Sequence, residues 1–404
     1  MKPTRWIVGC VVAANALTCA AANSVTLAQA VEAAWQRTHA AVGPQGLMQR
    51  AEAEQRAAAA LLPASPSLAL STRSDRWQGD NGTREHEIGV TLPLWLPGRR
   101  DARQGAARAA FGMAERSVTA ERLRLAGQVR ELAWSLAGLQ AEAAAADEQR
   151  RYLQRLTDDV ERRVKAGDLA RSDALAARGE LLRADAAALE LQQRLQSERL
   201  RWATLTGLAE TVDLQRDEAD DTGMATDTDA HPTLRLAAQA TEAARRQVEV
   251  ARAERSDAPE LSLSIRRERA EWGRAYDGSV AIGLRVPFGS DGRNLPLQAV
   301  ALATLDNART DEARLRLQLE AEVAIAREAL RSAARQLDAE QTRVRLLRER
   351  AGLIDASFRA GESALPVLLA AANEAALAEA ALARQHAALG SARARLHQAM
   401  GLLP

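Results

Sequence analysis

The stretch that decides the fold is "TLPLWLPGRR", Thr91 to Arg100, where an apolar, strand-like run meets a proline–glycine break and a basic start. A related stretch, "RVPFGSDGRN", covers Arg285 to Asn294. Three pairs of identical residues lie 194 positions apart: Pro93 and Pro287, Gly98 and Gly292, Arg99 and Arg293. The chain therefore contains the same strand-to-helix transition twice.

Other segments recur at the same or nearly the same offset. "RVKAGDLARSDAL", Arg163 to Leu175, resembles "SFRAGESALPVLL", Ser357 to Leu369. The "TGL" that begins at Thr206 resembles the "MGL" that begins at Met400. Several matches at one offset indicate an internal duplication. The sequence predicts a first repeat over 23–209, an acidic equatorial linker over 210–230 and a second repeat over 231–404.

The first residues have the layout of a secretory signal peptide. Lys2 and Arg5 precede an apolar run that ends in small residues at Ala22. Such a run is shorter than a transmembrane helix and is removed at a small-residue site. We predict a signal peptide over 1–22. Because Cys10 and Cys19 both fall inside it, the mature chain would carry no disulfide in an oxidising compartment.

Composition and spacing favour long helices. Aromatic residues are 3% of the chain and the formal net charge is +1, so no overall charge points to nucleic acid. Leu125, Leu132 and Leu139 recur every seven residues, which is typical of coiled-coil packing. Two long helices are predicted over about 98–165 and 292–359, each spanning on the order of 100 Å.

Shorter helices are predicted beside the long ones, over about 27–62, 170–207, 231–258 and 364–401. The helices at 170–207 and 231–258 together match one long helix in length. We expect these two to stack end to end, with the linker between them. The helix at 364–401 would stack with the N-terminal helix at 27–62.

Four segments before the long helices alternate between apolar and polar residues. They lie at about 67–77, 85–95, 260–272 and 279–288, and this period of two predicts strands with one apolar face. Each strand is long enough to cross a bilayer when tilted. Aromatic residues lie near the strand ends, as in the girdles of membrane barrels: Trp77, Trp95, Trp272, Tyr276 and Phe288. Since four strands leave open edges, several chains must complete the barrel, and three would give twelve strands.

The duplicated order of helix, two strands, long helix, turn and helix resembles the TolC-type outer-membrane efflux family. The resemblance rests on the turn motifs "RRVKAGDLARSDAL" and "ASFRAGESALPVLL" and on the "LTGL" and "AMGL" helix ends. "LPLWLPGRRDARQGAARAA" further resembles the CzcC-like heavy-metal efflux branch. The fold implied is mainly α with a small β part. Long antiparallel coiled-coil helices form an α-barrel tunnel, and four strands per chain join a trimeric 12-stranded transmembrane β-barrel.

The resemblance implies a homotrimer embedded in outer-membrane lipid with its helices in the periplasm. It also implies a periplasmic adaptor (membrane fusion) protein and an inner-membrane RND-type pump as partners, with no cofactor and no catalysis. The chain would be a passive exit duct for small toxic solutes or metal cations. A duct of a type I protein secretion system has the same fold and remains open. A non-channel periplasmic coiled-coil scaffold is the alternative from another class.

Three groups of residues are candidates for these roles. The periplasmic turns supply the adaptor-contact residues: Lys165, Gly167, Asp168, Arg171, Ser172, Gly361, Glu362 and Ser363. Family members carry acidic residues six and nine positions after the second turn glycine, where this chain has Val367 and Ala370. An acidic constriction is therefore assigned to Asp173, with Asp168 second and a helix N-cap as its competing role. The barrel–tunnel junction comprises Pro93, Trp95, Pro97, Gly98, Arg99, Arg100, Pro287, Gly292 and Arg293.

The sequence contains no motif typical of an enzyme active site or of a metal-binding site. There is no glycine-rich phosphate loop and no nucleophile elbow. The five histidines are scattered without ligand spacing, so no metal site is predicted. The arginines at the start of the long helix oppose the helix dipole, and we expect them to meet lipid headgroups or neighbouring chains.

Overall fold

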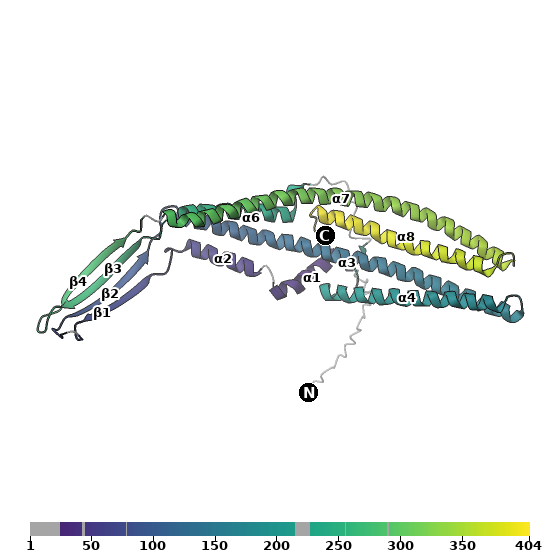
Figure 1. Cartoon of the computed structure of the whole chain (residues 1–404), viewed down its shortest axis with the longest axis horizontal. Coiled ribbons are helices and arrows are strands. Elements are labelled where there is room, and N and C mark those ends of the chain that lie inside the picture. The colour runs from purple at the N-terminus through teal and green to yellow at the C-terminus, as the bar shows by residue number, and fades with distance from the viewer. Residues whose placement is uncertain (1–24, 43–44, 78, 215–226, 255, 289–290) are drawn as a thin grey trace, which may run out of the picture.

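The computed structural model describes residues 25–42, 45–77, 79–214, 227–254, 256–288 and 291–404. The molecule is a long rod of helices with a four-stranded sheet at one end (Figure 1). The mainly α fold with a small β part is confirmed. The predicted signal peptide over 1–22 and the middle of the predicted linker lie outside the described residues.

Two helices run the length of the rod. Helix α3 spans Arg99–Ala166 and helix α7 spans Asp291–Arg359, with 68 and 69 residues. Gly98 and Gly167 flank α3 in the left-handed region, with φ of 79° and 90°, which glycine adopts without strain. Pro296 lies in the second turn of α7 rather than the first, still close enough to the start to cost few helical hydrogen bonds.

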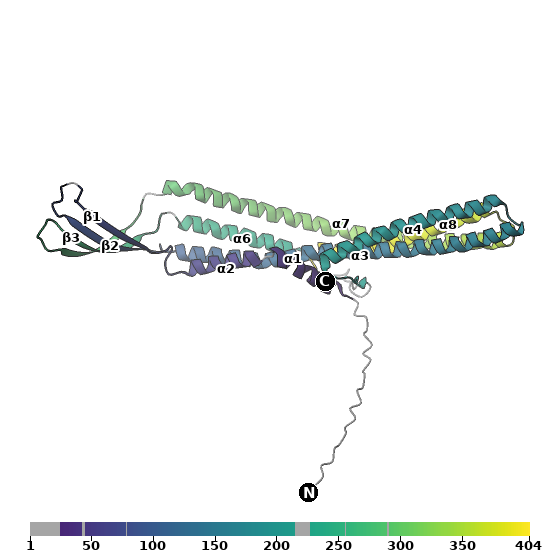
Figure 2. The ribbon, with the colours of Figure 1, turned by 90° about the horizontal axis from the view of Figure 1, so that it is seen from below.

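The shorter helices are α4 (Arg171–Thr206), α6 (Pro232–Ala253) and α8 (Leu365–Ala399). Helix α4 contacts α3 and α1, whereas α6 and α8 each contact both α3 and α7. At the middle of the rod, the end of α8 meets the start of α6, because a Cβ on Gly401 would lie 2.7 Å from His231 and Pro232. The expected stacking of 170–207 on 231–258 is therefore wrong. Helices α4 and α6 lie on opposite sides of α3, and α4 stacks with α1 and α8 with α6 (Figures 1 and 2).

The single N-terminal helix predicted over 27–62 is also wrong. The structure has two helices, α1 (Leu27–Val42) and α2 (Gln45–Ala59), on either side of Gly43-Pro44. Proline has no N–H to donate and disfavours helical geometry in the residue before it, which accounts for the interruption. Helix α2 runs along α3, and α1 contacts both α3 and α4.

The sheet joins both halves of the chain. Strands β1 (Ser67–Ser74), β2 (Arg84–Pro93), β3 (Glu260–Arg269) and β4 (Asp277–Arg285) pair antiparallel in that order. The predicted strands were three residues too long at the hairpin ends of β1 and β3, and two to three residues too long at the opposite ends of β2 and β4. Strands β2 and β3 pair from Arg84–Arg269 to Pro93–Glu260, although they come from different repeats. Strands β1 and β4 are the open edges.

Four apolar clusters hold the described helices together, and the two largest lie at the middle of the rod and at its turns. At the middle of the rod, Trp35 of α1 and Trp202 of α4 pack with Val129 and Leu136 of α3. At the far end, Leu156 and Val160 of α3 pack with Phe358 of α7 and Leu365 and Leu368 of α8. The rod is therefore anchored at its middle and at its turns, with small residues between.

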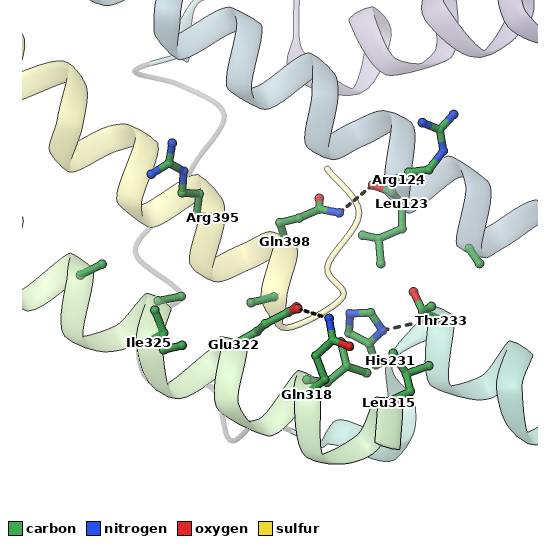
Figure 3. A pocket seen from close by; sticks show the side chains of 15 residues that line it. Leu123, Arg124, His231, Thr233, Leu315, Gln318, Glu322, Ile325, Arg395 and Gln398 are labelled. Atoms are coloured by element: carbon green, nitrogen blue, oxygen red, sulfur yellow. Dashed lines mark hydrogen bonds between the residues drawn. The ribbon is translucent and has the colours of Figure 1, made fainter. Parts of the chain in front are cut away.

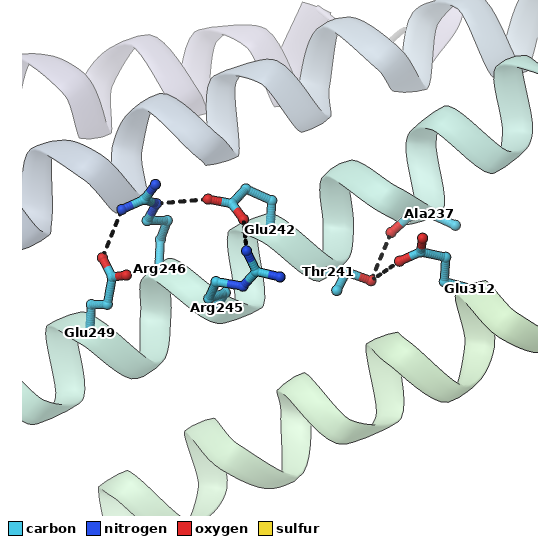
Figure 4. A network of polar contacts seen from close by, with 7 residues as sticks. All are labelled: Ala237, Thr241, Glu242, Arg245, Arg246, Glu249 and Glu312. Carbon is cyan, nitrogen blue, oxygen red and sulfur yellow. Dashed lines mark hydrogen bonds and ion pairs between the residues drawn. The ribbon is translucent and has the colours of Figure 1, made fainter. Parts of the chain in front are cut away.

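Helix α6 is held between the long helices by polar contacts. Gln239 donates to the Ala109 carbonyl oxygen of α3 at 3.2 Å, and the Thr241 hydroxyl donates to Glu312 of α7 at 2.7 Å. Along the same helix, Arg246 bridges Glu242 and Glu249 (Figure 4). These contacts fix the rotation of a helix that has few large apolar side chains.

Helices α3 and α8 approach through glycine. Gly390 of α8 faces the ring of Trp134 of α3, and a Cβ there would lie 2.0 Å from the ring. Helix α8 is apolar and long enough to cross a membrane by composition alone, but its buried residues pack in this protein interior. Its low polarity is explained by packing on two long helices.

Replacing Gly390 with alanine should destabilise the protein by about 1–3 kcal/mol, because the new methyl overlaps the Trp134 ring. Gly352 of α7 is the matched control, since nothing lies within 4 Å of its Cβ position. Gly352→Ala should be neutral or stabilise by about 0.5–1 kcal/mol through helix propensity. Thermal unfolding of both variants measures the difference. Equal melting temperatures would show that the close approach of Gly390 to Trp134 does not determine stability.

Candidate functional site

Three arginines join the sheet end of α3 to its neighbouring segments. The buried Arg99 donates to the carbonyl oxygen of Ser256, just beyond α6. Arg100 donates at 2.7 Å to the carbonyl oxygen of Ala59, the last residue of α2. Arg103 pairs at 2.6 Å with Glu254, the C-cap of α6. Positive charge is favourable near helix C-termini, so the two neighbouring helix ends offset its unfavourable position at the start of α3.

Arg99 and Arg100 were expected to meet lipid headgroups or neighbouring chains, and the structure adds contacts within the chain that the sequence did not predict. Both guanidinium groups bind carbonyl oxygens of their own chain. Trp95 belongs to the same arrangement, because its indole donates to the Ala60 carbonyl oxygen at 3.2 Å and its ring lies 5.5 Å from the Arg103 guanidinium. Pro93 ends β2, and Pro97 precedes the left-handed Gly98.

The second junction differs from the first. Helix α7 begins at Asp291, so Gly292 is a helical residue and not a left-handed cap. Pro287 lies beyond the end of β4, and Asn294 donates at 2.8 Å to the Glu254 carbonyl oxygen. The side chain of Arg293 lies outside the described part. The two sequence copies thus reach the helix by different local geometry.

The α3–α4 turn is closed by backbone hydrogen bonds around Gly167. The Asp168 amide donates to the Arg163 carbonyl oxygen at 2.9 Å, and the Asp168 side chain is exposed rather than serving as the N-cap. Ala170 is the N-cap, and its amide donates to the Asp173 carboxylate at 3.2 Å. Asp173 is therefore half-buried and has a structural contact, while Lys165, Arg171 and Ser172 are exposed around it.

The α7–α8 turn repeats this geometry. Gly361 has φ of 79°, and the Glu362 amide donates to the Ser357 carbonyl oxygen at 2.9 Å. The hydroxyls of Ser357 and Ser363 lie 2.6 Å apart. Both turns lie at the same end of the rod (Figure 1). Their residues therefore form one surface, held by the apolar cluster at the rod end.

A cavity lies where α6 and α8 meet, at the middle of the rod (Figure 3). Its volume is about 550 Å³, and its lining is mostly apolar, including Leu123, Leu315 and Leu319. His231 is buried in its wall and accepts the Thr233 amide through Nδ1, which caps α6. Burial lowers the pKa of His231, while the Gln398 backbone and Glu322 oppose that shift. A neutral imidazole is what a capping acceptor requires.

The sheet has one apolar and one polar face. The apolar face exposes a band of large side chains that no other part of the chain covers in the described structure: Leu68, Leu70, Ile88, Val90, Leu263, Ile265, Val280, Ile282 and Leu284. On the opposite face Arg266 pairs with Glu85 at 3.0 Å and with Glu87 at 3.3 Å. This segregation is typical of a strand set with lipid on one side and water on the other.

The helical layer also has two uncovered sides. The helices form a single layer of parallel rows, which we call files. The first file contains α2, α1 and α4, the second is α3, the third contains α6 and α8, and the fourth is α7. On α4, three leucines seven residues apart are more than half exposed: Leu175, Leu182 and Leu189. On α7, Leu346 and Leu353 are 58% and 68% exposed. Apolar stripes on both outer files indicate further helix packing.

Among the residues that the structure describes, no group of three or more His, Cys, Asp or Glu could hold a metal ion. The sequence did not indicate the carbonyl contacts of Arg99 and Arg100, because those partners lie in distant segments. The buried capping role of His231 had a signal, since it directly precedes Pro232 at the helix start.

The sequence matches the model of the outer membrane efflux protein family over residues 45–208 and 228–402. The two matched segments correspond to the two halves of the chain and cover most of it. No curated protein matches the sequence.

Solved structures share the fold at low identity. VceC, an outer membrane protein of Vibrio cholerae, has a TM-score of 0.71 at 18% identity, covering 93% of this chain and 96% of VceC. CusC, described as forming a transmembrane channel, has a TM-score of 0.75 at 18% identity, covering 94% and 93%. The CmeC outer membrane channel of Campylobacter jejuni has a TM-score of 0.73 at 15% identity, covering 93% and 84%.

Replacing both Arg99 and Arg100 with alanine should lower stability by about 2–4 kcal/mol, because two helix-end carbonyl contacts are lost. Arg108→Ala is the control, since this exposed arginine of α3 contacts only a carbonyl one turn away among its described hydrogen bonds. Protease resistance of the α2–α3 and α6–α7 connections should fall in the double variant alone. An unchanged digestion pattern would contradict this role.

Proposed function

The chain belongs to the outer membrane efflux protein family, and we propose that it is the outer-membrane channel of a tripartite efflux system. It lies in the outer membrane, with its helical part in the periplasm. The finer proposal is a homotrimer that receives small toxic solutes or metal cations from a periplasmic adaptor and an inner-membrane pump. The chain itself would be a passive duct, with energy supplied by the pump.

The observation that carries the proposal is that the sheet of each chain has two different open edges, β1 and β4. Strands β1 and β4 leave backbone groups unpaired, and lipid cannot satisfy them. Because the outer strands run antiparallel to each other, β1 of one chain can extend the sheet beyond β4 of the next. The leucine stripes on α4 and α7 lie on the same two edges. Unlike edges make a head-to-tail contact, and such contacts form a ring when the rotation from one chain to the next closes.

A ring of three chains would give a twelve-stranded barrel, an even number within the range of known membrane barrels. The apolar sheet face would meet lipid and the face with Arg266, Glu85 and Glu87 would line water. In the helical part, each of the three chains would contribute its four helical files to the wall of the tunnel. The rod-end turns would form the periplasmic mouth, where we place the adaptor contacts at Gly167, Gly361 and their neighbours.

Charge placed on the leucine stripe should prevent trimer formation. Leu182→Asp with Leu189→Asp buries two carboxylates in the proposed interface, at a cost of several kcal/mol. Ala176→Asp with Ala187→Asp is the matched control on exposed positions of the same helix outside the stripe. Mass photometry of detergent-solubilised protein should give monomers for the first variant and trimers for the control. Trimers from both variants would overturn the proposed edge.

The periplasmic mouth includes Asp173 as the proposed acidic constriction. One oxygen of its carboxylate accepts the Ala170 amide, which leaves the other available to a passing ion. Asparagine retains the capping acceptor while removing the charge. The charge and the cap can therefore be tested separately.

Asp173→Asn should leave the melting temperature unchanged and weaken divalent-cation block of the single-channel current by about tenfold, as expected for loss of a ring of close charges. Asp173→Ala should reduce both the block and the melting temperature, because it also removes the cap. Planar-bilayer recordings measure the block. If divalent cations block the current through Asp173→Asn as strongly as through the parent protein, the constriction lies elsewhere.

A further inference from the structure

The apolar face of the sheet changes character near the hairpins. Rows of leucine, isoleucine and valine end at Leu70, Ile88, Ile265 and Val280. Two residues further along the strands, the same face carries His86 and Arg267, followed by Arg84 opposite Arg269. Side chains alternate between faces, so these arginines point to the same side as the apolar band.

The charges of this sheet end are separated by face. The carboxylates of Glu85 and Glu87 lie on the polar face with Arg266. In the described structure no carboxylate lies within ion-pair distance of Arg84, Arg267 or Arg269. The apolar face therefore carries concentrated positive charge at its hairpin end and none along its apolar band.

These arginines are held in place by aromatic rings. Arg269 lies 4.7 Å from the Trp272 ring and 5.1 Å from the Tyr276 ring. Arg84 lies 5.7 Å from Trp272, and Arg267 lies 5.6 Å from Tyr276. We name these five residues the basic aromatic belt. Cation–π contact orients a guanidinium without neutralising it, so its N–H donors remain able to bind an anion.

The belt is itself fixed to the neighbouring hairpin. The Trp272 amide donates to the Asn81 carbonyl oxygen at 3.0 Å, and its indole donates to the Asp80 carbonyl oxygen at 2.9 Å. Gly82 makes room for this ring, since a Cβ there would lie 2.4 Å from the Trp272 nitrogen. Arg269 also donates to the Gly82 carbonyl oxygen at 3.2 Å. The cluster is therefore ordered before any ligand arrives.

We propose that the basic aromatic belt binds the phosphate groups of the anionic glycolipid in the outer leaflet. Arginine on a lipid-facing strand is costly at the bilayer midplane and tolerated at the interface, which places the belt at headgroup depth. Aromatic rings are favoured at that depth. The guanidinium fork matches phosphate oxygens, and the apolar band directly below would contact the acyl chains. One ligand thus fits both parts of the face.

Among the described residues, the opposite end of the apolar face shows no such cluster. There Leu92, Leu261 and Leu284 form the last paired row, and Arg99 and Arg100 are bound to carbonyl oxygens of their own chain. Headgroup recognition is therefore assigned to the hairpin end alone. This inference rests on the outer-membrane orientation in the proposed function, with the hairpins outward, but not on the cargo.

The test uses native mass spectrometry of the purified full-length protein with bisphosphorylated lipid A. The belt variant combines Arg84→Gln, Arg267→Gln and Arg269→Gln. The control variant combines Arg73→Gln, Arg266→Gln and Arg285→Gln, which removes equal charge from the polar face. The parent and control should bind the glycolipid alike, and the belt variant should bind about tenfold more weakly or worse.

Three outcomes would overturn the inference. They are equal binding by the belt variant and the parent, equal binding of dephosphorylated lipid A, and displacement of the glycolipid by equimolar inorganic phosphate. The last would show a free-anion site and not a lipid site. If the belt variant does not fold, Arg267→Gln alone and the phosphate requirement of the parent decide the matter. Single-channel conductance of the same samples reports separately on the proposed function.

Discussion

The backbone at the sheet edges sets the strongest constraint on this molecule. Every unpaired N–H and C=O group in hydrocarbon costs several kcal/mol, so a four-stranded sheet with an apolar face cannot remain open in a bilayer. The pairing of β2 with β3 joins the two hairpins within the chain, so that β1 and β4 are the strands left to pair with neighbouring chains. The duplication therefore does more than lengthen the protein. It supplies two hairpins that meet in the middle and two unlike edges outside.

The connection between sheet and rod shows how the protein passes from one type of structure to the other. Each helix that ends there leaves carbonyl oxygens without helical partners. Near the start of α3, Arg100 binds the last carbonyl of α2, Arg103 pairs with the C-cap Glu254 of α6, and Arg99 binds the Ser256 carbonyl just beyond that cap. A basic start that is unfavourable for its own helix stabilises the ends of two others. The second copy uses Asn294 in this region, where fewer helix ends meet.

Periodicity in the sequence was sufficient for the fold class and for the approximate extent of α3, α7 and the strands. Both rest on local rules, namely a period of seven at Leu125–Leu132–Leu139 and a period of two in the strands. It failed where partners are distant in sequence. The stacking of α8 on α6 depends on the placement of α4 and α6 on opposite sides of α3, which no periodic pattern records. The arginine contacts at the junction and the role of Gly390 opposite Trp134 are likewise set by tertiary packing. The basic aromatic belt could have been predicted from the sequence. Arg84, Arg267 and Arg269 lie an even number of positions from the apolar residues of their strands, which places them on the same face.

The stacking of helices at the middle of the rod has a mechanical consequence. Among the described helices, only α3 and α7 pass this level without a break, while the files made of α1 with α4 and of α8 with α6 are each divided there. Bending stiffness at any level depends on how many continuous helices carry the load. At this level the divided files are joined by side-chain packing, including Trp35 on Trp202, and not by continuous backbone. A change in that packing could therefore turn the turn-bearing end relative to the sheet-bearing end while the length of the rod is preserved. A buried histidine and a cavity occupy the same level, so movement at this section changes a space that is already present.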